Sequence, residues 1–277
     1  MKITKSTLKR IIKEEIEQLA RGHISLSRGQ TQNIRQTQDS AKKIIKLLSS
    51  TDPDNVDHGL AILDFLEDQQ LTGTIASYIT FDSKSNLITT RGFDRPQELG
   101  MILNYFAEKS DRVKNMLNQI EILDMTDGFI TNVDFLIFCT NLKSLNLLYC
   151  TSLENIDGLK GCTNLITLDL RRCESLQNVD GLKGCTNLTR LNLGSCKSLQ
   201  NVDELVGCTN LKSLNLSFCE SLQNVDGLEG CTNLTTLNLR WCSSLPPELQ
   251  ELFITDEYGT AHEKFMEALN AAKGNSL

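Results

Sequence analysis

The sequence predicts an α/β solenoid, a right-handed superhelix of short coils with a curved parallel sheet on its concave side. First, the tetrapeptide Cys-Thr-Asn-Leu recurs every 23 residues, starting at residues 139, 162, 185, 208 and 231. Second, each copy continues into the pattern L-x-x-L-x-L-x-x-C, for example LTRLNLGSC at 188–196. Such a short apolar–polar alternation is typical of a strand with one buried face. A repeated unit that cannot bury that face alone must stack against identical neighbours.

The leucines of the repeat predict the core. Leu145 and Leu147, with their counterparts at 23-residue intervals, face inward from the strands. Leu153, Ile156 and Leu159 return along the convex side and close the coil. Burying one leucine is worth roughly 1.5–3 kcal/mol. We therefore expect the stability of the solenoid to be a sum of terms from single coils and from the interfaces between neighbours.

The repeat degenerates at both ends, as terminal coils usually do. The first coil keeps three apolar strand positions, Ile120, Leu123 and Met125, but has Gly128 where a cysteine is expected. Downstream, the segment 244–254 predicts a shortened coil with three strand positions, Leu249, Leu252 and Ile254. Four residues at helical spacing then predict a helix that covers the last coil: His262, Phe265, Met266 and Leu269.

All ten cysteines of the chain fall within the repeat, in two sets that alternate along the sequence. One set ends the strands: Cys150, Cys173, Cys196, Cys219 and Cys242. The other set precedes them: Cys139, Cys162, Cys185, Cys208 and Cys231. Neighbouring strands lie about 4.8 Å apart, a distance that disulfides tolerate. However, side chains that point in the same direction stack rather than bridge, and each set has five members, so one cysteine of each set would stay unpaired. Without C-x-x-C, and with three histidines, a zinc site has poor support. We interpret the first set as weak donors to loop carbonyls and the second as small apolar side chains.

A ladder of aspartates accompanies the cysteines: Asp157, Asp180, Asp203 and Asp226, with Asp134 in the first coil. Stacked carboxylates could hold Ca²⁺, which prefers oxygen ligands. Asp before Gly-Leu is also typical of an N-cap, whose carboxylate accepts backbone N–H groups at the start of a short helical turn. We favour the N-cap.

The repeat resembles the leucine-rich repeat family, whose signature is L-x-x-L-x-L-x-x-[N/C]. The Cys-x-x-Leu before each strand is similar to a subclass of bacterial surface proteins, and the CESLQNV segment at 173–179 is similar to the plant disease-resistance subclass. The resemblance covers residues 120–255, about half of the chain. It implies a solenoid that recognises other proteins.

The outward strand positions predict the binding surface. Core positions barely differ among the copies, whereas outward positions do, and Tyr, Trp and Arg are enriched at binding hot spots. We therefore predict a protein or peptide ligand on the concave face of a monomer that has no cofactor, metal or catalytic residue. The expected contacts are Tyr149, Asp169, Arg171, Arg172, Arg190, Asn192, Asn215, Phe218, Asn238, Arg240 and Trp241. The alternative is a solvated surface that varies freely among the copies.

The chain outside the repeats shows no motif with chemistry. The expected organisation is a basic amphipathic helix (1–20), a polar linker (21–37), a mostly helical flank with a hairpin at 77–91 (38–119), the solenoid (120–255), and a cap helix with a tail (256–277). The N-terminal helix is expected to dock on a partner helix or a larger complex.

Charge is distributed unevenly along the chain. Residues 1–46 hold eleven Lys/Arg and four Asp/Glu, about +7, and the remainder holds 17 and 31, about −14. The acidic body argues against nucleic-acid binding by the solenoid. Charges interrupt every apolar run near the N-terminus, so the sequence predicts neither a secretory signal nor a membrane span. A cytoplasmic location is expected.

Two other classes of function compete with binding. The protein could be an assembly component that is tethered through its basic N-terminal helix. It could also be an enzyme, because some bacterial leucine-rich repeat proteins carry a cysteine-dependent ubiquitin ligase domain. Here every cysteine falls within the coils, no G-x-x-x-x-G-K phosphate loop occurs, and His23, His58 and His262 lie near no nucleophile motif. We therefore prefer a non-enzymatic binding module.

Overall fold

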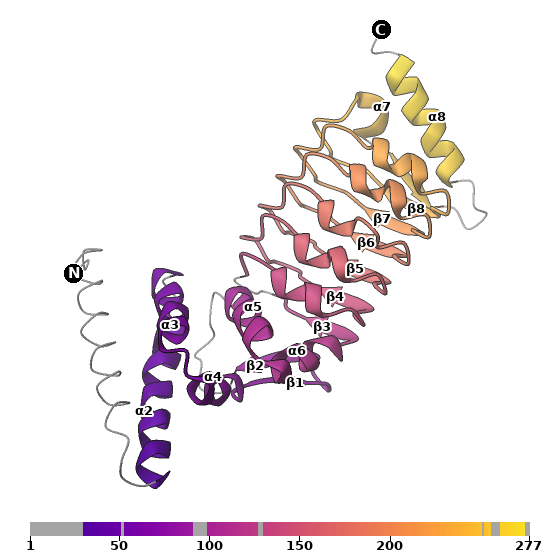
Figure 1. Ribbon diagram of the computed structural model, residues 1–277. Helices are drawn as coiled ribbons and strands as arrows, with labels where there is room; N and C mark the ends of the chain where they lie inside the picture. Colours follow the sequence, from indigo (N-terminus) through magenta and orange to yellow (C-terminus); the bar gives the residue numbers. More distant parts are fainter. Residues whose placement is uncertain are drawn as a thin grey trace, which may run out of the picture.

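The computed structural model describes residues 30–50, 53–90, 99–126, 130–250, 252–255 and 261–274. The chain runs from a helical flank through a row of stacked coils to a C-terminal helix (Figure 1). The predicted helix at 1–20 lies outside the described residues, as does the larger part of the predicted linker.

The strands form one sheet in chain order. Six are parallel: β3 (Ile122–Asp124), β4 (Ser144–Asn146), β5 (Thr167–Asp169), β6 (Arg190–Asn192), β7 (Ser213–Asn215) and β8 (Thr236–Asn238). From β4 to β8 each strand position pairs with its own counterpart in the next copy of the repeat, so that Leu145 pairs with Leu168 and Leu168 with Leu191. The period of the sequence is therefore the register of the sheet.

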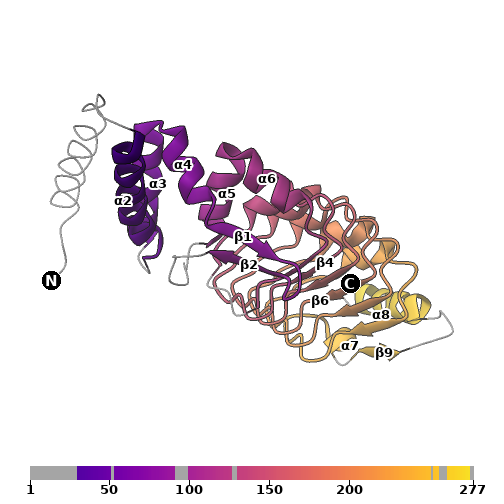
Figure 2. The same ribbon diagram turned by 90° about the horizontal axis from the view of Figure 1, so that it is seen from below.

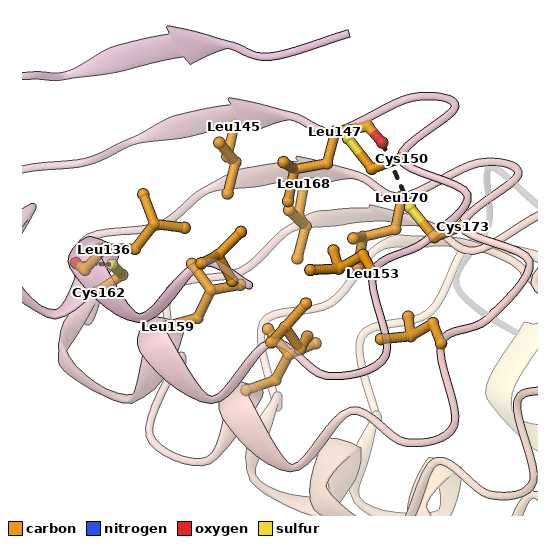
Figure 3. Close-up of a cluster of buried hydrophobic side chains, with 14 of the residues drawn as sticks. Leu136, Leu145, Leu147, Cys150, Leu153, Leu159, Cys162, Leu168, Leu170 and Cys173 are labelled. Carbon is orange, nitrogen blue, oxygen red and sulfur yellow. Dashed lines mark hydrogen bonds between the residues drawn. The ribbon is translucent and has the colours of Figure 1, made fainter. Parts of the chain in front are cut away.

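A 3-10 turn lies on the side of each coil opposite its strand. These turns are η1 (Asp134–Phe138), η2 (Asp157–Gly161), η3 (Asp180–Leu182), η4 (Asp203–Gly207) and η5 (Asp226–Gly230). Between strands and turns, the predicted leucines are buried. Figure 3 shows Leu145, Leu147 and Leu168 from the strand side meeting Leu153 and Leu159 from the return side. The predicted solenoid is confirmed.

The prediction that the aspartates cap the 3-10 turns is wrong. Asp157 is already the first residue of η2, the cap position belongs to Ile156, and the turn has no side-chain cap hydrogen bond. The Asn155 Oδ1 atom instead accepts the Asp157 N–H at 3.2 Å, and the Asp157 carboxylate pairs with Lys160 Nζ at 2.9 Å. An Asn side chain bonds readily to the backbone two residues later. The Asn of each Asn-x-Asp segment, and not the Asp, therefore accepts the backbone N–H at the start of the turn.

The N-terminal flank is mostly helical. It contains α2 (Gln30–Leu48), α3 (Pro53–Leu66), α4 (Gln69–Ala76), β1 (Ile79–Asp82), β2 (Leu87–Thr90), α5 (Leu99–Lys109) and α6 (Asp111–Asn118). The strands β1 and β2 form an antiparallel hairpin. Helix α2 begins at Gln30, inside the segment predicted as linker. No Gly or Pro follows Gly29 before the apolar face of α2, so the helix propagates through these polar residues.

Both ends of the solenoid are covered (Figure 2). At the first coil, Asp124 N–H donates to Asn86 O in the hairpin turn at 2.8 Å. Arg112 Nη1 ties α6 to the chain before it, donating to Ala76 O at 2.8 Å and Ile79 O at 2.9 Å. The bond to Asn86 lies at the edge of β3, which otherwise offers unpaired backbone groups to other chains.

The last coil differs from its prediction. Leu249 lies on a short helix, α7 (Pro247–Gln250), and the final strand, β9 (Phe253–Thr255), pairs with β8 in the antiparallel sense. The connection from β8 to β9, at 239–252, is shorter than the connection from β7 to β8, at 216–235. The chain is too short to return along the convex side, so it turns back. Helix α8 (Ala261–Gly274) then covers this end with Phe265 fully buried, as predicted for a cap.

Candidate functional site

The outward side of the sheet, here called the sheet face, consists of four rows, each with one residue per coil. The first row is Ser144, Thr167, Arg190, Ser213 and Thr236. The central row is Asn146, Asp169, Asn192, Asn215 and Asn238. The third row is Leu148, Arg171, Gly194, Ser217 and Arg240. The edge row is Tyr149, Arg172, Ser195, Phe218 and Trp241. All eleven predicted contacts lie in these rows.

The edge row has an unusual backbone. Its five residues have positive φ: Tyr149 65°, Arg172 59°, Ser195 64°, Phe218 61° and Trp241 66°. In the first four, the backbone N–H donates to a carbonyl of the next coil, as from Tyr149 to Arg171 O at 3.0 Å and from Phe218 to Arg240 O at 2.9 Å, and Trp241 N–H donates to Gln250 O of α7 at 3.0 Å. A left-handed conformation costs an L-residue about 1–2 kcal/mol, and glycine adopts it readily. Stacked hydrogen bonds therefore hold the row in place.

Aromatic rings dominate the edge row. Phe218 and Trp241 stack with ring centroids 6.0 Å apart and an interplanar angle of 15°. The Arg172 guanidinium lies 5.2 Å from the centroid of the Tyr149 ring. Tyr149, Phe218 and Trp241 remain 42%, 47% and 56% exposed. Between the two stacks the edge row has only the small side chain of Ser195.

The central row is structural as well as accessible. Each oxygen accepts a backbone N–H two residues later: Asn146 from Leu148 at 3.1 Å, Asp169 from Arg171 at 3.1 Å, Asn192 from Gly194 at 3.2 Å, Asn215 from Ser217 at 3.0 Å and Asn238 from Arg240 at 3.1 Å. Asn215 Nδ2 also donates to Asn192 Oδ1 at 3.1 Å. The sequence analysis missed this task, although Asn and Asp are the residues that make such turns.

The sheet face carries more positive than negative charge. Arg171 makes a bidentate pair with Asp169, with Nε–Oδ1 at 3.0 Å and Nη2–Oδ2 at 2.7 Å, and this carboxylate raises the pKa of the guanidinium. Arg190, which is exposed, makes no ion pair within the part of the chain that the structure describes. The face therefore presents positive charge beyond what Asp169 neutralises.

The ten cysteines, all within the described coils, are buried and form no disulfide. At the strand ends each thiol donates to a carbonyl of the preceding coil, as Cys173 Sγ does to Leu147 O at 3.3 Å (Figure 3). In the other set, Cys162 Sγ donates to Leu136 O at 3.3 Å and Cys231 Sγ to Leu205 O at 3.3 Å. The first set thus donates as interpreted, and three members of the second set, Cys162, Cys185 and Cys231, also donate rather than only packing.

Burial makes these thiols reluctant to ionise. It raises the pKa of Cys185 and Cys242 to about 11 and that of Cys162 to about 12, from an ordinary value of 9.0. A thiol that stays protonated is a poor nucleophile. No group of three or more potential metal-ligating side chains lies together among the residues that the structure describes.

These raised pKa values predict a loss of stability in alkali. Below pH 9 the thiols are protonated in both states, and their contribution is fully present. Between pH 9 and about 11–12 the unfolded thiols ionise first, the unfolded state binds fewer protons, and the free energy of unfolding falls. Melting curves followed by circular dichroism should show the temperature midpoint falling over this range.

The control for the alkaline prediction is the double variant Cys162→Ala/Cys185→Ala, whose midpoint should fall less steeply with pH. In the native wild-type protein at pH 8, a thiol reagent such as DTNB should label none of the ten cysteines until urea is added. Rapid labelling of the native protein would contradict the assignment of buried, protonated thiols.

A second concave feature lies in the flank, where no motif had indicated one. It is a cavity of about 750 Å³ between α3, α4 and α5. Asp64 lies at its wall, paired with Lys109 Nζ at 2.9 Å and accepting a hydrogen bond from Tyr105 Oη at 3.2 Å. Burial, followed by the nearby Asp64 charge, raises the pKa of Tyr105. The Asp64 carboxylate is therefore engaged by both Lys109 and Tyr105.

Within the described residues, no helix combines the length and apolar composition that crossing a bilayer requires. A family model described as Leucine Rich repeat matches residues 184–202, 207–228 and 230–243. No curated protein sequence matches the chain.

Several solved structures are similar to this chain. Internalin C2 of Listeria monocytogenes is 25% identical over 53% of this chain and 70% of its own, with a TM-score of 0.42. A second internalin of that bacterium is 18% identical over 53% and 54%, with a TM-score of 0.36. A plant peptide hormone receptor in complex with RGF2 is 13% identical over 46% and 25%, with a TM-score of 0.33.

The repeated phrase, the parallel sheet with its 3-10 turns and the matching family model agree. Each coil of the structure is one copy of the phrase, and the matched residues span three of these coils. The coils of this chain are leucine-rich repeats.

Proposed function

We propose that this protein is a non-catalytic binding module that holds a protein or peptide ligand on its sheet face, mainly through the edge row. Leucine-rich repeats are generally protein-interaction modules. The observation that carries the proposal is the presence of three large exposed aromatic side chains, Tyr149, Phe218 and Trp241, at left-handed positions. Local backbone preference favours glycine there, so local folding energy does not account for their presence.

The geometry suits recognition. The backbone of the edge row is bonded from coil to coil, so the rings are held without further ordering of the chain. A ring has two rotatable side-chain bonds and a large contact area, which keeps the entropy cost of binding low. The neighbouring Arg171, Arg190 and Arg240 add charged hydrogen-bond donors beside the rings. For the ten buried thiols we propose no role in catalysis.

The test is affinity capture from an extract of the source organism, comparing the intact wild-type protein with the double variant Phe218→Ser/Trp241→Ser. Removing two rings from the centre of an interface should cost at least about 2 kcal/mol of binding free energy. Partners that wild type retains should therefore be depleted at least about tenfold by the variant.

The matched control is Phe65→Ser, which removes a ring that is 65% exposed on α3, away from the sheet face. Its captured partners should equal those of wild type. Equal capture by all three proteins would refute binding through the edge row. Circular dichroism of each variant checks that the solenoid is intact.

A further inference from the structure

We infer that the ligand segment bound by the sheet face is a short, extended, acidic stretch of polypeptide. This inference rests on the proposed function and specifies the chemistry of the partner. It comes from the distribution of charge between the two sides of the coils.

The strand side of the coils is basic. Over 139–149, 162–172, 185–195, 208–218 and 231–241 the chain carries one acidic residue, Asp169, and six basic ones: Lys143, Arg171, Arg172, Arg190, Lys212 and Arg240. The net charge of these strand segments is therefore +5. Asp169 is paired with Arg171, and Lys143 with Glu121 at 2.9 Å.

The return side of the same coils is acidic. The segments 150–161, 173–184, 196–207 and 219–230 hold three lysines, Lys160, Lys183 and Lys197, against nine carboxylates: Glu154, Asp157, Glu174, Asp180, Asp203, Glu204, Glu220, Asp226 and Glu229. Their net charge is −6. One repeat phrase thus places opposite charges on opposite sides of a solenoid whose chain as a whole is acidic.

The cations form a patch that spans four successive coils. Arg190 begins β6 and Lys212 immediately precedes β7, whereas Arg172 and Arg240 follow the ends of β5 and β8. Strands about 4.8 Å apart make this patch about 14 Å long along the axis, and five residues at about 3.3 Å each make it about 16 Å wide, so an extended segment of about five residues can cross it. Arginine is suited to bind carboxylates through two parallel hydrogen bonds. The edge row, which contributes Arg172, forms one margin of the patch, and its rings suit apolar residues interspersed with the acidic ones.

The small patch favours a peptide over a nucleic acid. Past the edge row the acidic return segments begin, with Glu174 two residues after Arg172 and Glu220 two residues after Phe218, and a charge is felt over about 8 Å at physiological ionic strength. A nucleic acid that extended its phosphates past the edge row would meet these carboxylates. An acidic peptide segment can confine its charge to about five residues.

The experiment uses two fluorescein-labelled probes, Glu-Glu-Phe-Glu-Glu-Phe-Glu and the same peptide with Gln at every Glu. Fluorescence anisotropy measures their binding to the full chain. Emission of Trp241, the sole tryptophan, reports whether the probe reaches the edge row. The Glu probe should bind at least about tenfold more tightly than the Gln probe, shift the Trp241 emission, and weaken as salt rises.

Two double variants with the same change in charge test whether probe binding depends on the sheet face or only on the net charge of the protein. Arg172→Glu/Arg190→Glu should weaken the Glu probe at least about tenfold, and Lys183→Glu/Lys197→Glu, on the return side, by about twofold or less. Equal weakening by both variants would overturn the inference, as would equal binding of the two probes. Tighter binding of a dT12 oligonucleotide than of the Glu probe would also overturn it.

Sedimentation velocity adds a further check. If the protein self-associates and Arg172→Glu/Arg190→Glu abolishes this, the acidic return side of a second copy occupies the sheet face. The inference of an acidic peptide ligand would then be overturned. If the Glu probe fails while partner capture still depends on Phe218 and Trp241, the charge inference falls and the proposed function stands.

Discussion

Substitution of Gly181 by alanine is expected to lower the free energy of unfolding by about 3 kcal/mol, the upper part of the range for overpacking. A Cβ at this position would lie 1.8 Å from Ile156 O, 2.5 Å from its carbonyl carbon and 3.1 Å from Asp157 N. All three atoms belong to the backbone of the preceding coil, so no side chain can rotate away. The two coils would have to separate.

The neighbouring coils support this expectation. Gly158 and Gly227 occupy equivalent positions, and a Cβ there would lie 2.0 Å from Val133 O and 2.1 Å from Val202 O. The fourth equivalent position holds Glu204, and there the preceding turn, η3, is shortened and is followed by Gly184 with φ of 90°. A side chain at this point thus coincides with a rearranged turn.

Urea denaturation followed by circular dichroism measures the effect of Gly181→Ala. The control is Gly73→Ala in α4, where a Cβ meets nothing within 4 Å. That change should raise stability by about 0.5–1 kcal/mol, because alanine is the better helix former. A loss at Gly181 below about 0.5 kcal/mol would show that the coils do not pack as closely as described.

Phe265→Ala is expected to cost about 3–5 kcal/mol at the C-terminal end, because the fully buried ring of α8 leaves a cavity over the last coil. Contacts in a solenoid are between neighbours, so the loss should be concentrated near α8 and decrease with distance from it. Hydrogen exchange should show reduced protection at 231–245 and little change at 139–150.

The control for the cap is Phe65→Ala, whose ring is 65% exposed and whose loss should change stability by less than about 0.5 kcal/mol. If Phe265→Ala lowered protection equally in the first and last coils, the solenoid would unfold as one unit. The nearest-neighbour description of its stability would then be wrong.

Where the sequence analysis was wrong, the cause was geometric. The aspartates were predicted to cap the turns because their residue type fits, but the turn starts one residue earlier than assumed, and Asn155 and its counterparts are in reach instead. At the C-terminus, the strand frame of Ile254 was predicted correctly, yet β9 runs antiparallel because the connection is too short for another full coil. Residue type indicates a role, and chain length and backbone direction decide which residue fills it.

The edge row illustrates the same limit. Its members were noted for their residue types, and nothing in the letters Tyr, Arg, Ser, Phe and Trp indicates a left-handed backbone. Tyr149 takes this conformation at the third position of a β-turn that Cys150 N–H closes on Leu147 O at 3.1 Å, and its own N–H bonds to Arg171 O in the next coil. Likewise, the split of charge between the two sides appears only when each residue is assigned to its side of the coil.

The sequence alone predicts the solenoid, the register of the parallel strands from β4 to β8 and the burial of the leucines and thiols. A strict 23-residue period places the same residue types at the same positions, so every coil packs in the same way. The three-dimensional arrangement was needed for the direction of β9, the asparagine bonds and the left-handed ladder of rings. The direction of β9 depends on the chain end, where the period stops. The asparagine bonds and the left-handed positions belong to local turns, but only the path of the backbone shows at which residue each turn begins.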